Sequence, residues 1–208
     1  MSGFFRIDGP FYKFGMIVYY LMVTNFLWVI FSIPLFTIGA STTALFYVMG
    51  KVVRDEDIST FKDYWKSFKM NFKQGTFIWL IMVAVFFVLY VNIRNVSLMG
   101  NMAKFIYPMQ IAVLIELLII SVYVFPLLSR YNMTIRNIFK MSFFLGNKHI
   151  FSTITCVASL VAIYYLFSKV PGLFILIFVS SYALVSYYII NRVFQKYFPD
   201  KKKEELEE

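Results

Sequence analysis

Apolar residues come in long uninterrupted blocks along this chain. Charge-free runs cover residues 14–50, 74–93, 150–168 and 170–191, and the run 105–129 is interrupted only by Glu116. Apart from the first, these blocks are 19–25 residues long, which is the length a helix needs to cross a bilayer at a rise of about 1.5 Å per residue. Because unpaired backbone groups are not tolerated in lipid, the blocks are predicted to be helices.

The pattern predicts an all-α, polytopic membrane protein with about five transmembrane helices. The spans are expected at residues 15–36, 76–93, 105–128, 150–168 and 172–190. They form a single helical membrane domain over residues 1–195, followed by a charged cytoplasmic tail at 196–208. The composition agrees, since 60% of the residues are hydrophobic and only 15% are charged, against about half and a quarter in soluble domains.

The net charge of +9 is explained by topology and does not indicate a nucleic-acid partner. Fifteen of the twenty lysines and arginines lie in residues 51–73, 130–148 and 192–203, between or after the spans. Positive residues favour the cytoplasmic side, so we expect the N-terminus outside and the C-terminus in the cytoplasm. The predicted location is the cell membrane, with several passes through the lipid bilayer.

Two cytoplasmic segments are predicted to be amphipathic surface helices. In the first, aromatic residues recur at steps of 4, 3 and 4, and lysines follow one position later: Phe61, Trp65, Phe68 and Phe72, with Lys62, Lys66, Lys69 and Lys73. An aromatic stripe beside a basic stripe is typical of a helix lying on anionic lipid. The second segment, residues 134–149, is similar but less regular.

The run from residue 14 to residue 50 is too long for one span and too short for two. We expect a helix break at Pro34, Gly39, Ser41 and Thr42. Proline leaves a backbone carbonyl without its helical donor, glycine permits a turn, and Ser41 or Thr42 can cap a new, shallow helix at the inner interface. The alternative is a binding loop, because broken helices form the substrate sites of many transporters.

Polar residues inside the predicted spans are candidates for partner contacts. Glu116 is the one acidic residue within a span, and a carboxylate there must face protein, water or a cation. Asn25 requires an interhelical partner. Asn92 and Arg94 end the second span, either as anchors at the interface or as contacts for a ligand.

Nothing in the sequence indicates an enzyme. His149 is the single histidine and Cys156 the single cysteine, which make no metal-binding set. Phosphate-binding and nucleophile motifs are absent from the sequence. We therefore expect no catalytic residue, no metal and no cofactor.

Three stretches resemble a known family: "GFFRIDGPFYKF", "NFLWVIFSIPLFTIGASTTALFYVMGKVVRDED" and "FKMNFKQGTFIWL". They are similar to the YesL-like proteins, small membrane proteins mainly of Gram-positive bacteria that form a family of unknown function. Members are typically encoded beside carbohydrate ABC importers, so the resemblance implies an association with sugar uptake. The family supplies no catalytic residues.

These observations predict a non-enzymatic accessory or regulatory membrane subunit of a carbohydrate ABC importer. Glu116 and Asn25 would pack against a partner helix, and the cytoplasmic helices would contact the permease or the ATPase. One alternative is a stand-alone, small oligomeric transporter or channel that uses Glu116 with the break at residues 34–42. Another is a membrane scaffold or sensor.

Overall fold

The computed structural model describes residues 10–96, 100, 102–169 and 171–198. Within these residues all regular structure is helical, which confirms the all-α prediction. The helices are α1 (Pro10–Phe31), η1 (Leu35–Thr37), α2 (Ile38–Val53), α3 (Thr60–Arg94), α4 (Ala103–Arg130), α5 (Ile135–Lys148), α6 (Ile150–Ser168) and α7 (Pro171–Tyr197). Most of the predicted charged tail, residues 199–208, lies outside the described part of the chain.

Among the described residues, six helices are long and apolar enough to cross a membrane, which is typical of a multi-pass membrane protein. The sequence predicted about five, and the difference is the stretch Leu35–Val53, which contains α2. This stretch had been assigned to a shallow helix at the inner interface.

The assignment of α2 to a surface position is wrong, because α2 is the central helix of the fold. In its apolar window 61% of the residues are buried inside the protein, against 11% for α6. Ala40, Ala44 and Val48 are fully buried, and α2 packs against α1, α3, α4 and α7. Small side chains allow this, since they let neighbouring helices approach closely.

The predicted surface helix at residues 61–73 is not a separate element. It is the first part of α3, a helix of 35 residues that continues past residue 75 to Arg94. Gly75 does not end the helix; it lies against α2, and a Cβ added there would be 2.9 Å from the Cα of Ala40. The glycine therefore serves a close helix crossing.

The aromatic stripe of this segment faces the protein core. Phe68 is 7% exposed, and its ring centroid lies 4.9 Å from that of Phe31 at the end of α1. Trp65 and Phe72 pack against the same core, whereas Phe61 is 60% exposed. The four lysines that follow these aromatics are all exposed: Lys62, Lys66, Lys69 and Lys73. The expectation of a lipid-facing aromatic stripe is therefore wrong for three of its four members.

The second predicted surface helix is a separate element, α5. Ile138 and Leu145 are fully buried on the side that packs against α4, while Phe143 and Phe144 are 51% and 43% exposed. This helix is amphipathic, as its sequence pattern indicated.

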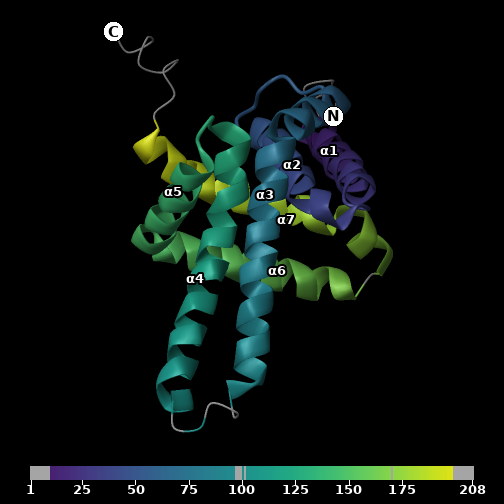
Figure 1. Cartoon of the computed structure of the whole chain (residues 1–208). Helices are drawn as coiled ribbons and strands as arrows, with labels where there is room; N and C mark the ends of the chain where they lie inside the picture. The colour runs from purple at the N-terminus through teal and green to yellow at the C-terminus, as the bar shows by residue number, and fades with distance from the viewer. Residues whose placement is uncertain (1–9, 97–99, 101, 170, 199–208) are drawn as a thin grey trace.

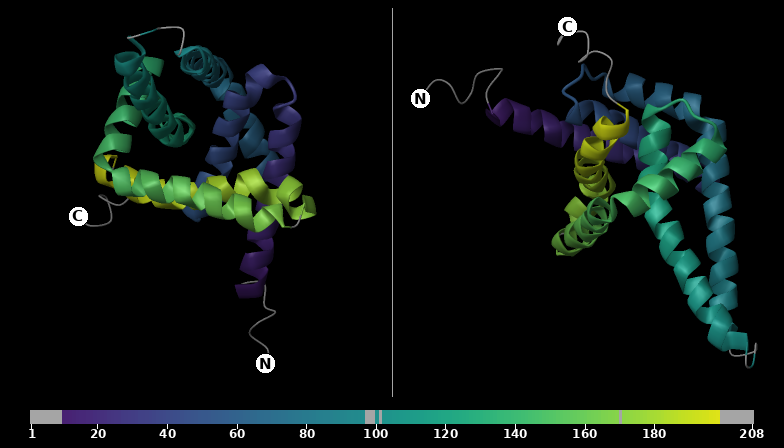
Figure 2. Two further views of the ribbon diagram at one scale, coloured as in Figure 1. Left: turned by 90° about the horizontal axis from the view of Figure 1, so that it is seen from below. Right: turned by 90° about the vertical axis from the view of Figure 1, so that its left-hand side faces the viewer.

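The helical pairs run in different directions (Figure 1). α3 and α4 form a long hairpin that projects from the rest of the molecule, while α6 and α7 lie side by side and run across it. The two further views show the same crosswise arrangement (Figure 2). Both pairs cross a flat bilayer only if both are tilted.

α1 and α2 form an antiparallel pair, which bears on the predicted topology. Tyr12 and Tyr20 of α1 line a cavity of about 260 Å³ together with Val52 and Ile58. The start of α1 thus lies at the same end of the molecule as the turn after α2 (Figure 1). The five-span prediction required these two segments to lie on opposite sides of the membrane, which is at odds with this packing.

Candidate functional site

Asn25 joins α1 to α7 inside the protein. Its side chain is 2% exposed, and its Oδ1 accepts hydrogen bonds from the backbone amides of Val179 and Ser180 at 3.1 and 3.2 Å. A buried amide in an apolar helix pair stabilises the pair when its polar atoms are bonded. Asn25 therefore holds two helices of this chain together.

Glu116 lies on α4, away from Asn25. Its side chain is partly exposed, and its Oε1 accepts a hydrogen bond of 2.8 Å from Nδ2 of Asn147 at the end of α5. The same Asn147 amide donates to the carbonyl of Phe143 at 3.0 Å. The structure thus places the two predicted partner residues in different helix pairs.

Asn92 and Arg94 lie at the end of α3 that is remote from α2. Arg94 is exposed, and its guanidinium donates a 2.6 Å hydrogen bond to the hydroxyl of Tyr90 one turn earlier. Asn92 is partly exposed. This local bond keeps the Arg94 side chain along its own helix.

The helix break lies between Phe31 and Ile38, with Pro34 inside it. The hydroxyl of Thr37 donates to the carbonyls of Phe31 and Pro34, both at 2.6 Å. The indole of Trp79 donates to the carbonyl of Leu35 at 3.0 Å. Carbonyls released by the break are therefore bonded to side chains of the protein.

Gly39, Ser41 and Thr42 lie inside α2, so the predicted cap at Ser41 or Thr42 is wrong. The cap position belongs to Thr37. The Ser41 hydroxyl donates to the carbonyl of Trp28 at 3.1 Å and lies 2.6 Å from the Tyr64 hydroxyl. Thr42 accepts a 3.1 Å bond from the indole of Trp28. These hydroxyls tie α2 to α1 and α3.

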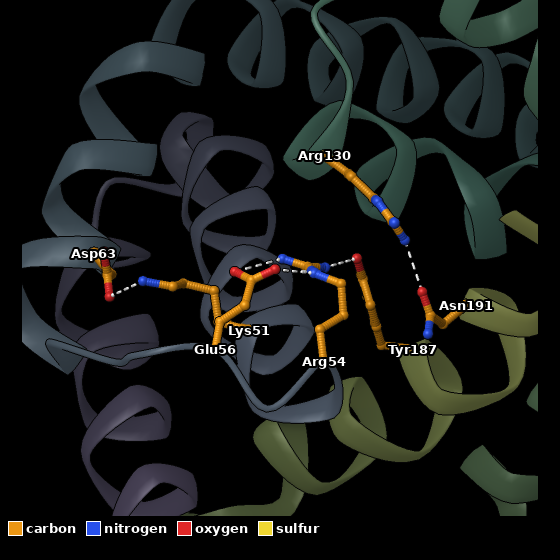
Figure 3. A network of polar contacts seen from close by, with 7 residues as sticks. All are labelled: Lys51, Arg54, Glu56, Asp63, Arg130, Tyr187 and Asn191. Atoms are coloured by element: carbon orange, nitrogen blue, oxygen red, sulfur yellow. Dashed lines mark hydrogen bonds and ion pairs between the residues drawn. The ribbon is translucent and has the colours of Figure 1, made fainter. Parts of the chain in front are cut away.

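A network of charged and polar side chains gathers where α2 and α4 end, against the C-terminal half of α7 (Figure 3). The guanidinium of Arg54 donates to the Glu56 carboxylate at 2.5 Å and also to the Tyr187 hydroxyl. Arg130 donates to Oδ1 of Asn191 at 2.7 Å. The network therefore connects residues separated by up to 133 positions.

The turn after α2 explains why Arg54 and Glu56 meet. Asp55 adopts a positive φ of 54°, which aspartate tolerates better than most residues. The amide of Glu56 then donates back to the carbonyl of Lys51 at 3.1 Å, as in a Schellman motif. The chain reverses at once and lays the Glu56 carboxylate beside the preceding arginine.

Two basic side chains of this network, Arg54 and Lys51, form ion pairs with carboxylates. The Arg54 side chain is only 16% exposed. Burial by itself lowers the pKa of its guanidinium, but the hydrogen bond to Glu56 and the nearby Tyr187 oxygen together raise the pKa above its usual value. Lys51 forms a second ion pair with Asp63 at 2.9 Å. Two ion pairs thus anchor the end of α2.

Sequence reasoning missed this network. Tyr187 and Asn191 lie in a run that reads as a plain apolar span, with no sign of a partner elsewhere in the chain. The one available signal was the pair of basic residues, Arg54 and Arg130, directly after apolar stretches. Pairing across the chain depends on the tertiary fold and cannot be read from that signal.

The arrangement is suited to holding helices together. In the described part of the chain no three His, Cys, Asp or Glu side chains lie close enough to hold a metal ion. Cys156 is buried, without a disulfide. Guanidinium and ammonium donors dominate the network described above.

Comparison with known proteins finds a similarity to one family in the first half of the chain. The family model described as "Protein of unknown function, DUF624" matches residues 21–93, from the second half of α1 to the end of α3. Over these residues the chain is similar to this YesL-like family. The matched segment contains Asn25, the break and Arg54, and it ends before Glu116.

One curated relative extends the similarity further along the chain. It is a protein of Bacillus subtilis (strain 168) described as "Uncharacterized protein YteU", 28% identical over 171 residues. The alignment covers 79% of this chain and 74% of the relative. No solved structure matches this chain.

Proposed function

We propose that this protein is a non-enzymatic accessory or regulatory subunit in the cell membrane that acts with a carbohydrate ABC importer. The partner class comes from the family resemblance, and the contact surfaces come from the structure. The protein would contact the permease within the membrane. Its exposed α3 lysines would contact the ATPase or the cytoplasmic loops of the permease.

The observation that carries this proposal is the position of Glu116. Its carboxylate lies on α4 among outward-facing apolar side chains, where Val113 is 49% exposed, Ile115 53% and Leu118 54%. A carboxylate is costly beside lipid, and a polar group on a neighbouring helix reduces that cost. A permease helix that donates to Glu116 would therefore pack here.

The exposed lysines of α3 offer the second contact. Lys62, Lys66 and Lys69 lie on the solvent side of the helix, while the aromatics between them are buried or, for Trp65, partly buried. A rigid row of positive charges favours association with an acidic surface and accelerates encounter. The expected partner is the ATPase or the cytoplasmic loops of the permease.

The alternative of a stand-alone transporter or channel has less support. Glu116 bonds to α5, whereas the carbonyls of the break bond to Thr37 and Trp79, so these hydrogen bonds do not join the two features. A groove of about 210 Å³ between α3 and α4 is lined almost wholly by apolar side chains, including Met82, Phe86 and Leu117. Such a lining does not suit a hydrophilic solute. A scaffold or sensor would predict unchanged sugar uptake on deletion.

Copurification tests the proposal. The tagged full-length chain is extracted from its native membrane in mild detergent, and bound proteins are identified by mass spectrometry. We expect the permease or ATPase of a carbohydrate importer with the wild type, and about a five- to thirtyfold loss with Glu116→Leu, since an interhelical polar contact contributes about 1–2 kcal/mol.

The matched control is Leu118→Met, which changes the same exposed face without removing a charge and should retain the partner. Copurification without any importer subunit would contradict the proposal. Solute flux into liposomes that contain only this protein, abolished by Glu116→Gln, would favour the transporter instead.

A further inference from the structure

A basic groove lies between the start of α6 and the end of α7. Its volume is about 370 Å³, and its lining includes His149, Ser152 and Thr155 on one side and Tyr188, Arg192 and Lys196 on the other. None of the described residues that line it is acidic. The network of Arg54 and Tyr187 described above does not contribute to this lining.

Two basic side chains of the groove contact tyrosine hydroxyls. The Arg192 guanidinium donates to the Tyr188 hydroxyl at 2.9 Å and lies 4.9 Å from the centre of that ring. This bond uses one of the five N–H donors of the guanidinium. His149 Nε2 lies 3.0 Å from the hydroxyl of Tyr197. The ion pairs of the described residues, Lys51–Asp63 and Arg54–Glu56, lie elsewhere.

The local potential is positive. Burial, followed by the charges of Lys196 and Lys148, lowers the pKa of His149 below its usual value. Lys148 itself lies over the ring of Tyr197, with its Nζ 5.3 Å from the ring centre. An anion that enters the groove would meet these charges together with the hydroxyl groups of Ser152 and Thr155.

The groove opens onto an apolar strip of α6. Phe151, which lines the groove, is 84% exposed. It is followed at helical spacing by Ile154, Val157 and Val161, which are 57%, 45% and 61% exposed. The polar end also coincides with the start of one candidate membrane span and the end of another. A basic site beside an exposed apolar helix matches both parts of a phospholipid.

We propose that this groove binds the phosphate of an anionic phospholipid, with Arg192 and Lys196 contacting the headgroup and the α6 strip contacting an acyl chain. Guanidinium and ammonium donors suit phosphate oxygens. Ser152 adds a neutral donor, whereas the Thr155 hydroxyl donates to the carbonyl of Phe151 at 2.8 Å and can only accept. The site is independent of the importer partner proposed above.

Lipid retention measured by native mass spectrometry tests the site. The full-length protein is reconstituted with phosphatidylglycerol or with phosphatidylcholine and released in mild detergent. We expect selective phosphatidylglycerol adducts on the wild type, reduced at least about fivefold in the double variant Arg192→Gln/Lys196→Gln, because each basic residue near an anionic lipid contributes measurably.

The matched control is Lys62→Gln/Lys66→Gln, which removes the same charge from exposed positions on α3 and should retain the lipid. Arg192→Lys, which keeps the charge, should also retain most of it. Equal adducts for the two lipids, or equal loss in the two double variants, would overturn the proposal. So would displacement of the adduct by millimolar inorganic phosphate, which would show a site for free anions. If the double variant does not fold, as judged by gel filtration, the single variant Lys196→Gln carries the test.

Discussion

At the scale of single residues, glycine sets how closely the central helices approach. A Cβ added to Gly39 would lie 2.1 Å from the carbonyl oxygen of Gly75 and 2.6 Å from Cβ of Trp79. Both contacts involve atoms that cannot move without shifting the backbone of α3. Gly39 was expected to permit a turn, but its role is to admit a neighbouring helix.

This contact predicts that Gly39→Ala destabilises the protein. Overpacking of this kind costs about 1–3 kcal/mol, which should lower the thermal midpoint measured by tryptophan fluorescence in detergent. Gly15→Ala is the matched control, because nothing lies within 4 Å of an added Cβ there. An unchanged midpoint for Gly39→Ala would mean that α2 and α3 do not cross at this residue.

Glu116 and Asn25 show how far the interpretation of single polar residues extends. The sequence correctly indicated that each needs a polar contact, because bare polar groups are costly in lipid. It did not indicate which contact. Asn25 bonds to the backbone of α7, and Glu116 bonds to Asn147 of α5. Both partners lie far along the chain.

At the scale of elements, the first part of α3 differs most from its sequence-based interpretation. A row of aromatics beside a row of lysines is expected both for a helix on a lipid surface and for a helix packed on a protein core. In the structure Phe31 of α1 fills the centre of the aromatic stripe, with its ring 5.3 Å from that of Trp65 and 4.9 Å from that of Phe68. The sequence analysis found the aromatic stripe but expected lipid to cover it, whereas other helices of the protein do.

Substitutions at two phenylalanines of this helix distinguish a stripe that faces lipid from one that packs in the protein core. Phe68→Ala should destabilise the fold by about 3–5 kcal/mol, because it empties a packed site. Phe61→Ala, at a side chain that is 60% exposed, should leave the thermal midpoint nearly unchanged. Midpoints in detergent provide the measurement. Similar small effects at both positions would restore the interpretation of a surface helix.

At the scale of the whole molecule, the antiparallel pairing of α1 and α2 favours a topology with both termini on the same side. If all six candidate helices cross the membrane, the N-terminal segment joins the basic loops in the cytoplasm. Seventeen of the twenty lysines and arginines are then inside, instead of fifteen. This distribution satisfies the positive-inside rule better than the five-span arrangement does.

Cysteine labelling in intact cells tests this topology. Cysteines are appended to either terminus, in separate variants of a Cys156→Ser background, and treated with a membrane-impermeant maleimide. We expect both ends to react only after lysis, whereas a cysteine in place of Asn95, at the tip of the α3–α4 hairpin, should react in intact cells. Labelling of the N-terminus before lysis would support five spans.

The sequence by itself determined the helical class, the approximate positions of the apolar helices and the multi-pass character, because block length and helix rise are properties of the chain alone. Only the tertiary structure decided that α2 is central, that the stripe of α3 faces inward, and that Arg54 meets Tyr187. The physical reason is that an apolar pattern reports avoidance of water. Lipid and protein interior are similarly apolar, so the pattern does not say which of them covers a given face.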